Sequence, residues 1–301
     1  MKKILIITFN ILLLSKIAIS QNDVQFTHFT SSEMLFNPAL AGKNETIDAT
    51  LIARQQWMGF DQAPQTQLLN VGAHFDAISG GVGLSVSNDQ LGVENTINAK
   101  LMYAYKLKLD KKNNLSFGLG VGIINKSVKG SELIYDNMTD ENAQLTNESK
   151  LKADFDFGIG FFNEKISAGI STTHIDQGLK KSTIMKVPRH YYLYFKYKIK
   201  ASDKISIIPA VIARSSEFIT QFDINACMDY DNKFWFGLSY RYGDAYVGML
   251  GVTIAQKFKI GYSYDYSAGA LKSYSGGSHE IMISAAFPGA KSKGQPKSFF
   301  Q

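Results

Sequence analysis

The chain contains very little cysteine and tryptophan, with 1 Cys and 2 Trp among 301 residues. Because Cys227 stands alone, no disulfide can form within the chain, and cysteine pairing says nothing about the compartment. Cys227 lies in a segment of alternating polarity, on the face where a small residue fits. This position favours a packing role over a redox role.

Long apolar runs are also missing. The run Ile4–Leu14 is shorter than the roughly 20 apolar residues that a membrane-spanning helix needs, and no later stretch comes close. It follows a basic start and precedes the small residues Ala18 and Ser20, which is typical of a secretory signal peptide, residues 1–20, cut before Gln21. Since the residue directly after the cut is Gln21 and not cysteine, a lipoprotein-type anchor is not expected. Membrane insertion, if it occurs, must use strands.

Signals for a catalytic, cofactor or metal site are sparse. The histidines are scattered, with no i, i+4 pair and no cysteine partner, which argues against zinc; they are His28, His74, His174, His190 and His279. Gly118-x-Gly120-x-Gly122 alternates with apolar residues and predicts a strand whose inward positions exclude bulk, not a phosphate loop. The carboxylates from Asp136 to Glu148 lack the glycine and spacing of a calcium loop. We therefore predict no catalytic residue, no cofactor and no metal ligand.

The net charge of +6 does not predict a nucleic-acid partner. Part of it comes from the signal peptide and part from Lys291, Lys293 and Lys297 near the C-terminus. These tail residues lie outside every predicted strand and are interspersed with Gly and Pro, without the interleaved aromatic residues of a nucleic-acid surface.

What the sequence does contain is polarity that alternates with a period of two, which predicts strands. In Ile219–Tyr230 the apolar residues lie on one face and Asp223 on the other. In Leu151–Phe161 the polar face carries Asp154 and Asp156 in mid-strand, while the apolar face has no charge. A membrane barrel needs this arrangement, because lipid must contact only apolar side chains and every backbone amide must find a partner strand.

Fourteen such segments predict an antiparallel outer-membrane β-barrel over residues 47–287. Counting from the first strand, the even connections have six residues or fewer, whereas all the long ones are odd: 126–150, 174–189 and 267–277. Bacterial barrels alternate short periplasmic turns with longer external loops in this way. The expected strands are 47–57, 67–76, 80–88, 94–107, 114–125, 151–162, 166–173, 190–200, 205–214, 218–230, 233–242, 244–254, 257–266 and 278–287.

Tyrosine is abundant, with 15 residues, and is concentrated toward strand ends. Examples are Tyr103 and Tyr105, and the group Tyr191, Tyr192, Tyr194 and Tyr197. Amphipathic rings at strand ends suit the two membrane interfaces and predict an aromatic girdle. The alternative is that tyrosine is simply a good strand former.

Residues 21–46 lack alternation but are too apolar for a floppy tail. They carry apolar residues and end in a turn-like Asn-Pro-Ala sequence; we single out Phe26, Phe29, Phe36, Asn37 and Pro38. We predict a periplasmic or luminal segment that fills the barrel mouth, since fourteen strands enclose a water-wide lumen unless something occupies it. The alternative for Asn37-Pro38 is a simple turn that aims the chain into the first strand. Residues 288–301 are predicted to be a tail.

Charges of both signs are expected on inward faces of the strands. By alternation these residues are Arg54, Asp154, Asp156, Asp223, Arg241, Asp265 and Glu280. An isolated ion in a narrow lumen is costly, so we expect a network of ion pairs that holds the barrel's shape. The alternative is a permeation path lined by charge.

Several short blocks stand in a fixed order along the mature chain. They are Gln25-Phe26-x-x-Phe29, Phe36-Asn37-Pro38-Ala39-x-Ala41-Gly42, Arg54-Gln55-Gln56-Trp57-x-Gly59-Phe60, Trp235–Arg241, Gly261–Ser267 and Gly277–Ile281. Together they resemble the PorP/SprF family of the Bacteroidota. Small departures occur at Thr27-His28 and at Leu40, and they affect no role that we can name.

The resemblance implies a non-enzymatic integral outer-membrane protein of the type IX secretion system. The even number of strands predicts that both termini lie on the same side of the membrane, in the periplasm. The resemblance also implies a partner that is either a secretion component or the C-terminal sorting domain of a secreted adhesin, as in gliding motility. Two other classes stay open on the residues: a porin or fatty-acid-channel-like transporter, and an outer-membrane hydrolase.

Overall fold

The computed structural model of the chain describes residues 23–133, 146–176, 187–216, 219–269, 272 and 275–289. The predicted signal peptide and all but two residues of the predicted tail lie outside them. Short 3-10 turns are η1 (Phe29–Ser31), η2 (Glu33–Leu35), η3 (Pro38–Leu40), η4 (Asp76–Ile78) and η5 (Gly130–Glu132). The strands are β1 (Thr46–Gln55), β2 (Gln65–Phe75), β3 (Gly80–Leu91), β4 (Glu94–Lys108), β5 (Asn114–Lys129), β6 (Asn147–Phe162), β7 (Ile166–Thr173), β8 (His190–Tyr197), β9 (Ile199–Lys200), β10 (Ile205–Ser215), β11 (Thr220–Tyr230), β12 (Phe234–Arg241), β13 (Ala245–Ile254), β14 (Phe258–Ser267) and β15 (Ser278–Pro288).

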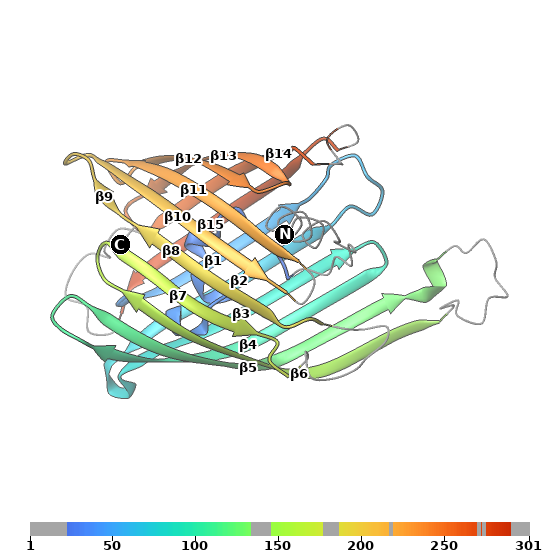
Figure 1. The fold of residues 1–301 in the computed structure, drawn as a ribbon, viewed down its shortest axis with the longest axis horizontal. Coiled ribbons are helices and arrows are strands. Elements are labelled where there is room, and N and C mark those ends of the chain that lie inside the picture. The colour runs from blue at the N-terminus through green and yellow to red at the C-terminus, as the bar shows by residue number, and fades with distance from the viewer. Residues whose placement is uncertain are drawn as a thin grey trace, which may run out of the picture.

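The strands form a closed antiparallel ring (Figure 1). Neighbours in sequence pair with one another, and β1 closes the ring against β15 in a register that runs from Thr46↔Pro288 to Gln55↔His279. The two-residue β9 pairs with β10 and stands outside the ring, which leaves 14 strands in the barrel. Closure removes free edges from the wall. The predicted all-β, 14-stranded antiparallel barrel is confirmed.

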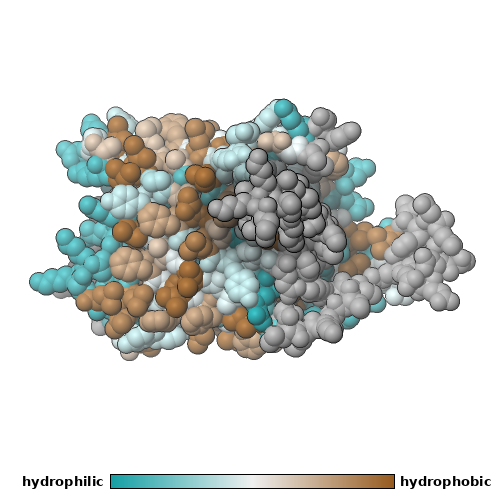
Figure 2. Space-filling model, viewed as in Figure 1, coloured by the Kyte–Doolittle hydropathy of each residue, from teal (hydrophilic) through white to brown (hydrophobic). Residues whose placement is uncertain are grey.

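The period of two separates an apolar outer surface from a polar interior. On β11, Phe222 and Ile224 are exposed on the outside, whereas Asp223 and Asn225 are buried inside. Figure 2 shows the result: the wall that faces the viewer is largely hydrophobic, and the end at the left is hydrophilic. Among the described residues, no helix is long and apolar enough to cross a bilayer.

Most strand bounds differ from the sequence-based expectation by a few residues, and two differences change the architecture. β5 continues to Lys129 and β6 begins at Asn147, so this hairpin is longer than predicted and projects beyond the other strands (Figure 1). The pattern concealed this because Lys126 and Lys150 look like loop residues, although they are paired across the hairpin. The expected strand 190–200 is interrupted at Lys198, which separates β8 from β9.

The expected aromatic girdle is wrong for two tyrosines. Tyr191 is exposed on the outer wall, as are Tyr103 and Tyr105. Tyr192 and Tyr194 have inward parity on β8 and are buried at 7% and 1% exposure. Clustering near a strand end does not decide the face that a ring occupies; alternation does.

Candidate functional site: a lumen filled by the N-terminal segment

Residues 23–45, here called the luminal segment, run through the inside of the barrel (Figure 1). At its start, Asp23 contacts His190, the first residue of β8, at the end of the barrel where the long connections emerge. At its finish, Gly42 lies against Gly81 near the short β2–β3 connection. The segment therefore passes from one mouth to the other before β1 begins.

Asn37 starts the last turn of the segment and also ties it to the wall. Its Oδ1 accepts a hydrogen bond from the backbone nitrogen of Ala39 at 2.9 Å. Pro38 follows at the first position of η3, where a missing N–H leaves no bond unmade. The Asn37 amide donates to the carbonyl oxygen of Ile159 on β6 at 3.1 Å. The Asn-Pro pair thus serves both as a cap and as a wall contact.

Glycines in the wall allow this close approach. A Cβ added at Gly118 would lie 2.1 Å from the backbone nitrogen of Ala39, and one at Gly158 would lie 2.0 Å from Oδ1 of Asn37. At Gly169 the added carbon would lie 2.4 Å from Nδ2 of Asn37. No larger residue fits these positions while the segment is in place. The glycines therefore form the floor on which η3 rests.

Aromatic rings of the segment pack on the wall. The ring centroid of Phe36 lies 5.8 Å from that of Tyr192 and 5.1 Å from that of Tyr194. Phe29 makes an edge contact with Tyr194 at 6.2 Å, and Phe26, 2% exposed, joins a separate apolar cluster. Burying one large apolar side chain contributes about 1.5–3 kcal/mol. The three phenylalanines consequently make the segment part of the core.

A small cavity lies beside the luminal segment among the described residues. A cavity of about 80 Å³ lies between the segment and β1, β2 and β15, and Thr30, Ser31 and Lys43 line its inner side. Such a volume holds a few water molecules. It does not form a wide aqueous pore.

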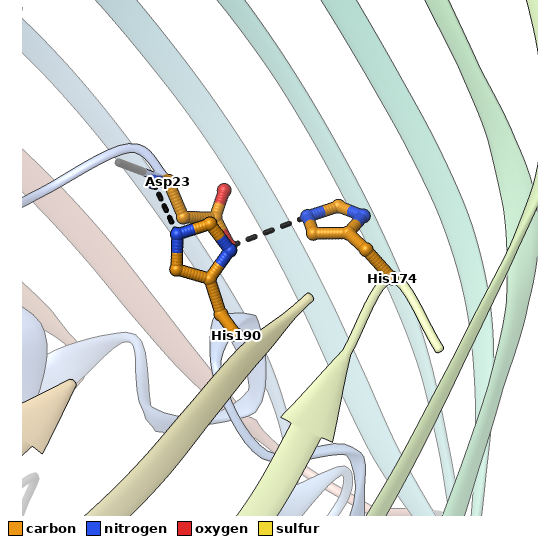
Figure 3. A group of neighbouring side chains, drawn as sticks. All are labelled: Asp23, His174 and His190. Carbon is orange, nitrogen blue, oxygen red and sulfur yellow. Dashed lines mark hydrogen bonds and ion pairs between the residues drawn. The ribbon is translucent and has the colours of Figure 1, made fainter. Parts of the chain in front are cut away.

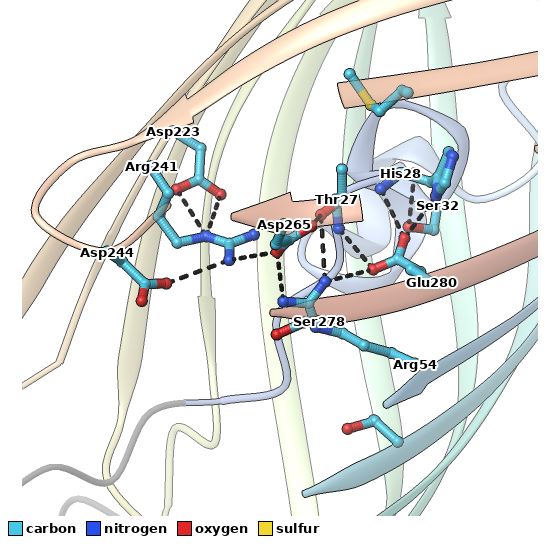
Figure 4. Close-up of polar contacts among 12 residues, drawn as sticks. Thr27, His28, Ser32, Arg54, Asp223, Arg241, Asp244, Asp265, Ser278 and Glu280 are labelled. Atoms are coloured by element: carbon cyan, nitrogen blue, oxygen red, sulfur yellow. Dashed lines mark hydrogen bonds and ion pairs between the residues drawn. The ribbon is translucent and has the colours of Figure 1, made fainter. Parts of the chain in front are cut away.

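Glu280 on β15 is the main polar contact for the segment (Figure 4). Its carboxylate accepts hydrogen bonds from the backbone nitrogens of Thr27 at 2.8 Å and His28 at 2.9 Å, and it contacts Nδ1 of His28 at 2.6 Å. Arg54 donates to Glu280 at 3.0 Å and to Asp265 at 2.6 Å. All five residues are buried. Each charge among them has a partner of opposite sign, which offsets the cost of its desolvation.

Arg241 on β12 extends this network around the wall. Its guanidinium lies 3.1 Å from Asp265 and 3.4 Å from Asp223. Arg214 on β10 donates to the same Asp223 at 2.8 Å. Because Asp265 contacts both Arg54 and Arg241, one chain of ion pairs continues from β1 to β10.

Asp154 and Asp156 belong to a different group. Both contact the ammonium of Lys100 on β4, at 2.9 Å and 2.7 Å respectively. Asp154 also lies 2.9 Å from Nδ1 of His174, just beyond the end of β7. The structure therefore brings together five of the seven residues singled out in the sequence and places these two aspartates on another part of the wall.

Other polar anchors of the segment were missed in the sequence. Glu33 is buried and contacts the ammonium groups of Lys43 and Lys196, and it accepts hydrogen bonds from Tyr194 and Ser167, both at 2.8 Å. Lys196 has inward parity on its strand, as does Lys100 on β4, so alternation could have identified both lysines. No pattern marks Glu33, because the segment has no repeat.

Ion pairs and hydrogen bonds join the luminal segment to the inner wall of the barrel. Backbone amides, phenyl rings and a carboxylate of the segment each meet a complementary group on the wall. The chemistry of the lumen therefore holds the segment in place.

Solved outer-membrane proteins share the fold at low sequence identity. The toluene transporter TbuX of Ralstonia pickettii matches with a TM-score of 0.52 and 10% identity, over 86% of this chain and 93% of that chain. Omp33 of Acinetobacter baumannii matches with 0.47 and 10%, over 82% and 99%. CdiB from Acinetobacter baumannii matches with 0.46 and 8%; 80% of this chain is covered, and the chain spans only 60% of CdiB. The likeness to TbuX shows the barrel fold alone.

Sequence comparison is more specific. Among curated proteins, no sequence matches the chain significantly. The sequence profile described as type IX secretion system membrane protein PorP/SprF matches residues 18–285. This range includes the luminal segment and nearly the whole barrel, and it confirms the resemblance seen in the sequence blocks. The chain therefore belongs to the PorP/SprF family of type IX secretion system membrane proteins.

Proposed function

We propose that this outer-membrane barrel acts in type IX secretion by binding, as a docking partner for the C-terminal sorting domain of a secreted adhesin or as an anchor for the secretion core. The observation that carries the proposal is the luminal segment, which occupies the space that a channel would need. A barrel whose lumen is filled presents its rims and loops as the surfaces available for function.

The pairing of charges in the lumen supports the alternative function, a porin-like channel, less well than it supports binding. Its charged residues face one another across short distances, as Arg54 does with Glu280, instead of lining a water path. A selective channel needs a continuous route on which ions bind and leave. We likewise propose that the protein is not an enzyme, since the buried carboxylates Glu33, Asp265 and Glu280 hold the segment.

We propose that the end with the short connections faces the periplasm, which is the usual orientation of bacterial barrels. Thr46 and Pro288 lie at that end, paired with each other. Asp23 lies at the opposite end, beside His174 and His190. In this orientation the described C-terminal end is periplasmic, and Asp23 lies at the external mouth. The periplasmic location of both termini stays a prediction, because residues 1–22 and 290–301 lie outside the described part of the chain.

The projecting β5–β6 hairpin is the docking surface that we propose for the partner. Within the described part of the chain, β6 pairs with β7 only over Phe157–Phe162. Phe155 still accepts a hydrogen bond from Ile175 on that edge. Alternate residues share an edge, so the backbone groups of Asn147, Ser149 and Leu151 point the same way, and they have no strand partner among the residues described. A free edge of this kind can accept an added strand.

Side chains next to this edge favour an extended strand of mixed charge as the occupant. Glu148 and Lys150 lie on the face that continues the lumen side, and Leu151 on the outer face is 65% exposed. A partner strand would place a basic residue opposite Glu148, an acidic one opposite Lys150 and an apolar one beside Leu151. The C-terminal domain of a secreted protein is the partner that the family assignment favours.

We expect Leu151→Pro to weaken partner recovery about tenfold or more, because it removes a backbone donor from the free edge and blocks strand addition. The substitution keeps the hydrogen bonds between β6 and β5, because the residues on either side of Leu151 donate them. The measurement is the amount of secreted protein copurified with tagged barrel from native membranes. Leu151→Ala is the matched control, since it shortens the same side chain but keeps the N–H. Equal recovery with both variants would exclude this edge as the docking surface.

A further inference from the structure

Three residues far apart in the sequence meet at the proposed external mouth. Asp23 is the first described residue of the luminal segment, His174 follows β7, and His190 opens β8 (Figure 3). Both histidines are 2% exposed. The cluster joins the luminal segment to both strands that flank the 174–189 connection, and neither the ion-pair network nor the proposed docking surface uses it.

The spacing of the polar atoms suits a metal ion. One ligand atom from each residue lies within 4.8 Å of the others, and Nε2 of His174 is 3.4 Å from Oδ2 of Asp23. That contact is long for a hydrogen bond. It is close to the separation of about 3.3 Å between ligand atoms around tetrahedral zinc, given Zn–N and Zn–O bonds of about 2.0–2.1 Å.

Neighbouring groups orient the ligands as they do in metal sites. Nδ1 of His174 lies 2.9 Å from Asp154, which turns Nε2 toward Asp23. The hydroxyl of Tyr192 donates to Oδ2 of Asp23 at 2.8 Å. A carboxylate behind a ligating histidine fixes its tautomer and raises its basicity.

His190 supplies a second ring nitrogen, Nδ1, that could bind the ion. Its Nε2 accepts a hydrogen bond from the backbone nitrogen of Asp23 at 3.1 Å. Its Nδ1 is buried and makes no well-aligned hydrogen bond among the described residues; the backbone of Pro188 is the neighbouring group that this ring also meets. Figure 3 shows this nitrogen on the side of the ring that faces the Asp23 carboxylate and His174. If Nδ1 of His190 binds the ion, its proton moves to Nε2, which can then no longer accept from the backbone N–H of Asp23. The loss of this one neutral hydrogen bond is far smaller than the free energy that a bound zinc ion contributes.

The local charge also favours a cation. Asp23, Asp154 and Asp156 bring three carboxylates together, whereas Lys100 is the ammonium that contacts the latter two. With neutral imidazoles these three carboxylates and one ammonium carry a net charge of −2, and the charge of nearby Arg214 is neutralised by Asp223. A divalent ion would balance this net charge. A protonated His174 between Asp23 and Asp154 would neutralise only one unit of this negative charge.

We propose that Asp23, His174 and His190 form a binding site for a divalent transition metal ion. Two imidazoles and one carboxylate suit Zn²⁺ best, with solvent in the fourth position. The bound ion fastens the start of the luminal segment to β7 and β8, and so closes the external mouth.

The test uses the full mature barrel in detergent, stripped with a chelator and titrated with ZnCl₂ by calorimetry. Co²⁺ absorption in the visible range reports the coordination geometry. We expect one ion per chain, weakened at least about a hundredfold by His190→Ala and about ten- to a hundredfold by Asp154→Asn, which removes the partner behind His174.

His279→Ala is the matched control, because His279 lies on the wall beside Tyr262, away from the cluster, and its loss should leave affinity unchanged. His190→Ala is the decisive variant, since it removes no charge and only one hydrogen bond from the apo protein. The proposal is overturned if the unaltered barrel binds no zinc at a one-to-one ratio. It is also overturned if His190→Ala binds zinc as tightly as the parent, which would leave His174 as a simple bridge between carboxylates.

Discussion

Deletion of residues 22–40 is expected to raise the ion conductance of the barrel in planar bilayers at least about tenfold, because fourteen strands enclose a lumen wide enough for water. Full-length protein should conduct poorly, since Phe26, Phe29 and Phe36 pack against the wall and the cavity beside the luminal segment at β1, β2 and β15 measures about 80 Å³. The measurement is single-channel current at fixed voltage and salt.

The deletion variant must first be shown to be a folded barrel. Resistance to unfolding in detergent without heat, and a shift in gel migration after boiling, provide that control, because the ring of strands does not require the segment for its backbone pairing. An already large conductance in the full-length protein, unchanged by the deletion, would mean that the luminal segment does not close the pore.

Replacing Glu280 by alanine should cost about 3–5 kcal/mol of unfolding free energy, because it leaves Arg54 short of one buried partner and two backbone amides without acceptors. The loss combines a weakened ion pair at Arg54, which keeps only Asp265 as its buried acidic partner, with unsatisfied donors at Thr27 and His28. Reversible unfolding by guanidinium in lipid vesicles measures the free energy.

Glu94→Ala provides the matched control for this substitution. Glu94 also pairs with a basic residue, Lys126, at 2.9 Å, but its side chain is 39% exposed at the rim. A pair of that kind contributes about 1 kcal/mol or less. Similar effects of the two substitutions would show that Glu280 is not a buried anchor for the luminal segment.

The barrel itself could be predicted because its constraints are local and periodic. Alternation identified the inward position of Asp223 and the outward position of Phe222, and the parity of connection lengths supported the strand count. The ends of β5 and β6 were less predictable. Lys126 and Lys150 are polar residues in strands that extend past the apolar wall, where the pattern resembles a loop.

The contents of the lumen were only partly predictable. Parity marks Arg54 and Glu280 as inward residues, but it cannot show that Glu280 accepts bonds from the backbone of Thr27 and His28. Those contacts depend on how the luminal segment, which has no periodicity, packs inside the closed barrel. Asp23, His174 and His190 meet for the same reason, since barrel closure brings together residues that the sequence separates widely.

Placement of the luminal segment inside the folded barrel can be tested directly with a disulfide between positions 39 and 160. A Cβ at Gly160 would lie 3.5 Å from Cβ of Ala39, within the range of about 3.5–4.5 Å that a disulfide spans. The variant combines Ala39→Cys and Gly160→Cys with Cys227→Ser, and the control replaces Gly160→Cys with Ile159→Cys on the opposite face of β6. We predict that mild oxidation of native membranes links 39 to 160 nearly completely and leaves the control pair unlinked. An unlinked cysteine at position 160 that reacts freely with a water-soluble maleimide would contradict the filled lumen on which the proposed function depends.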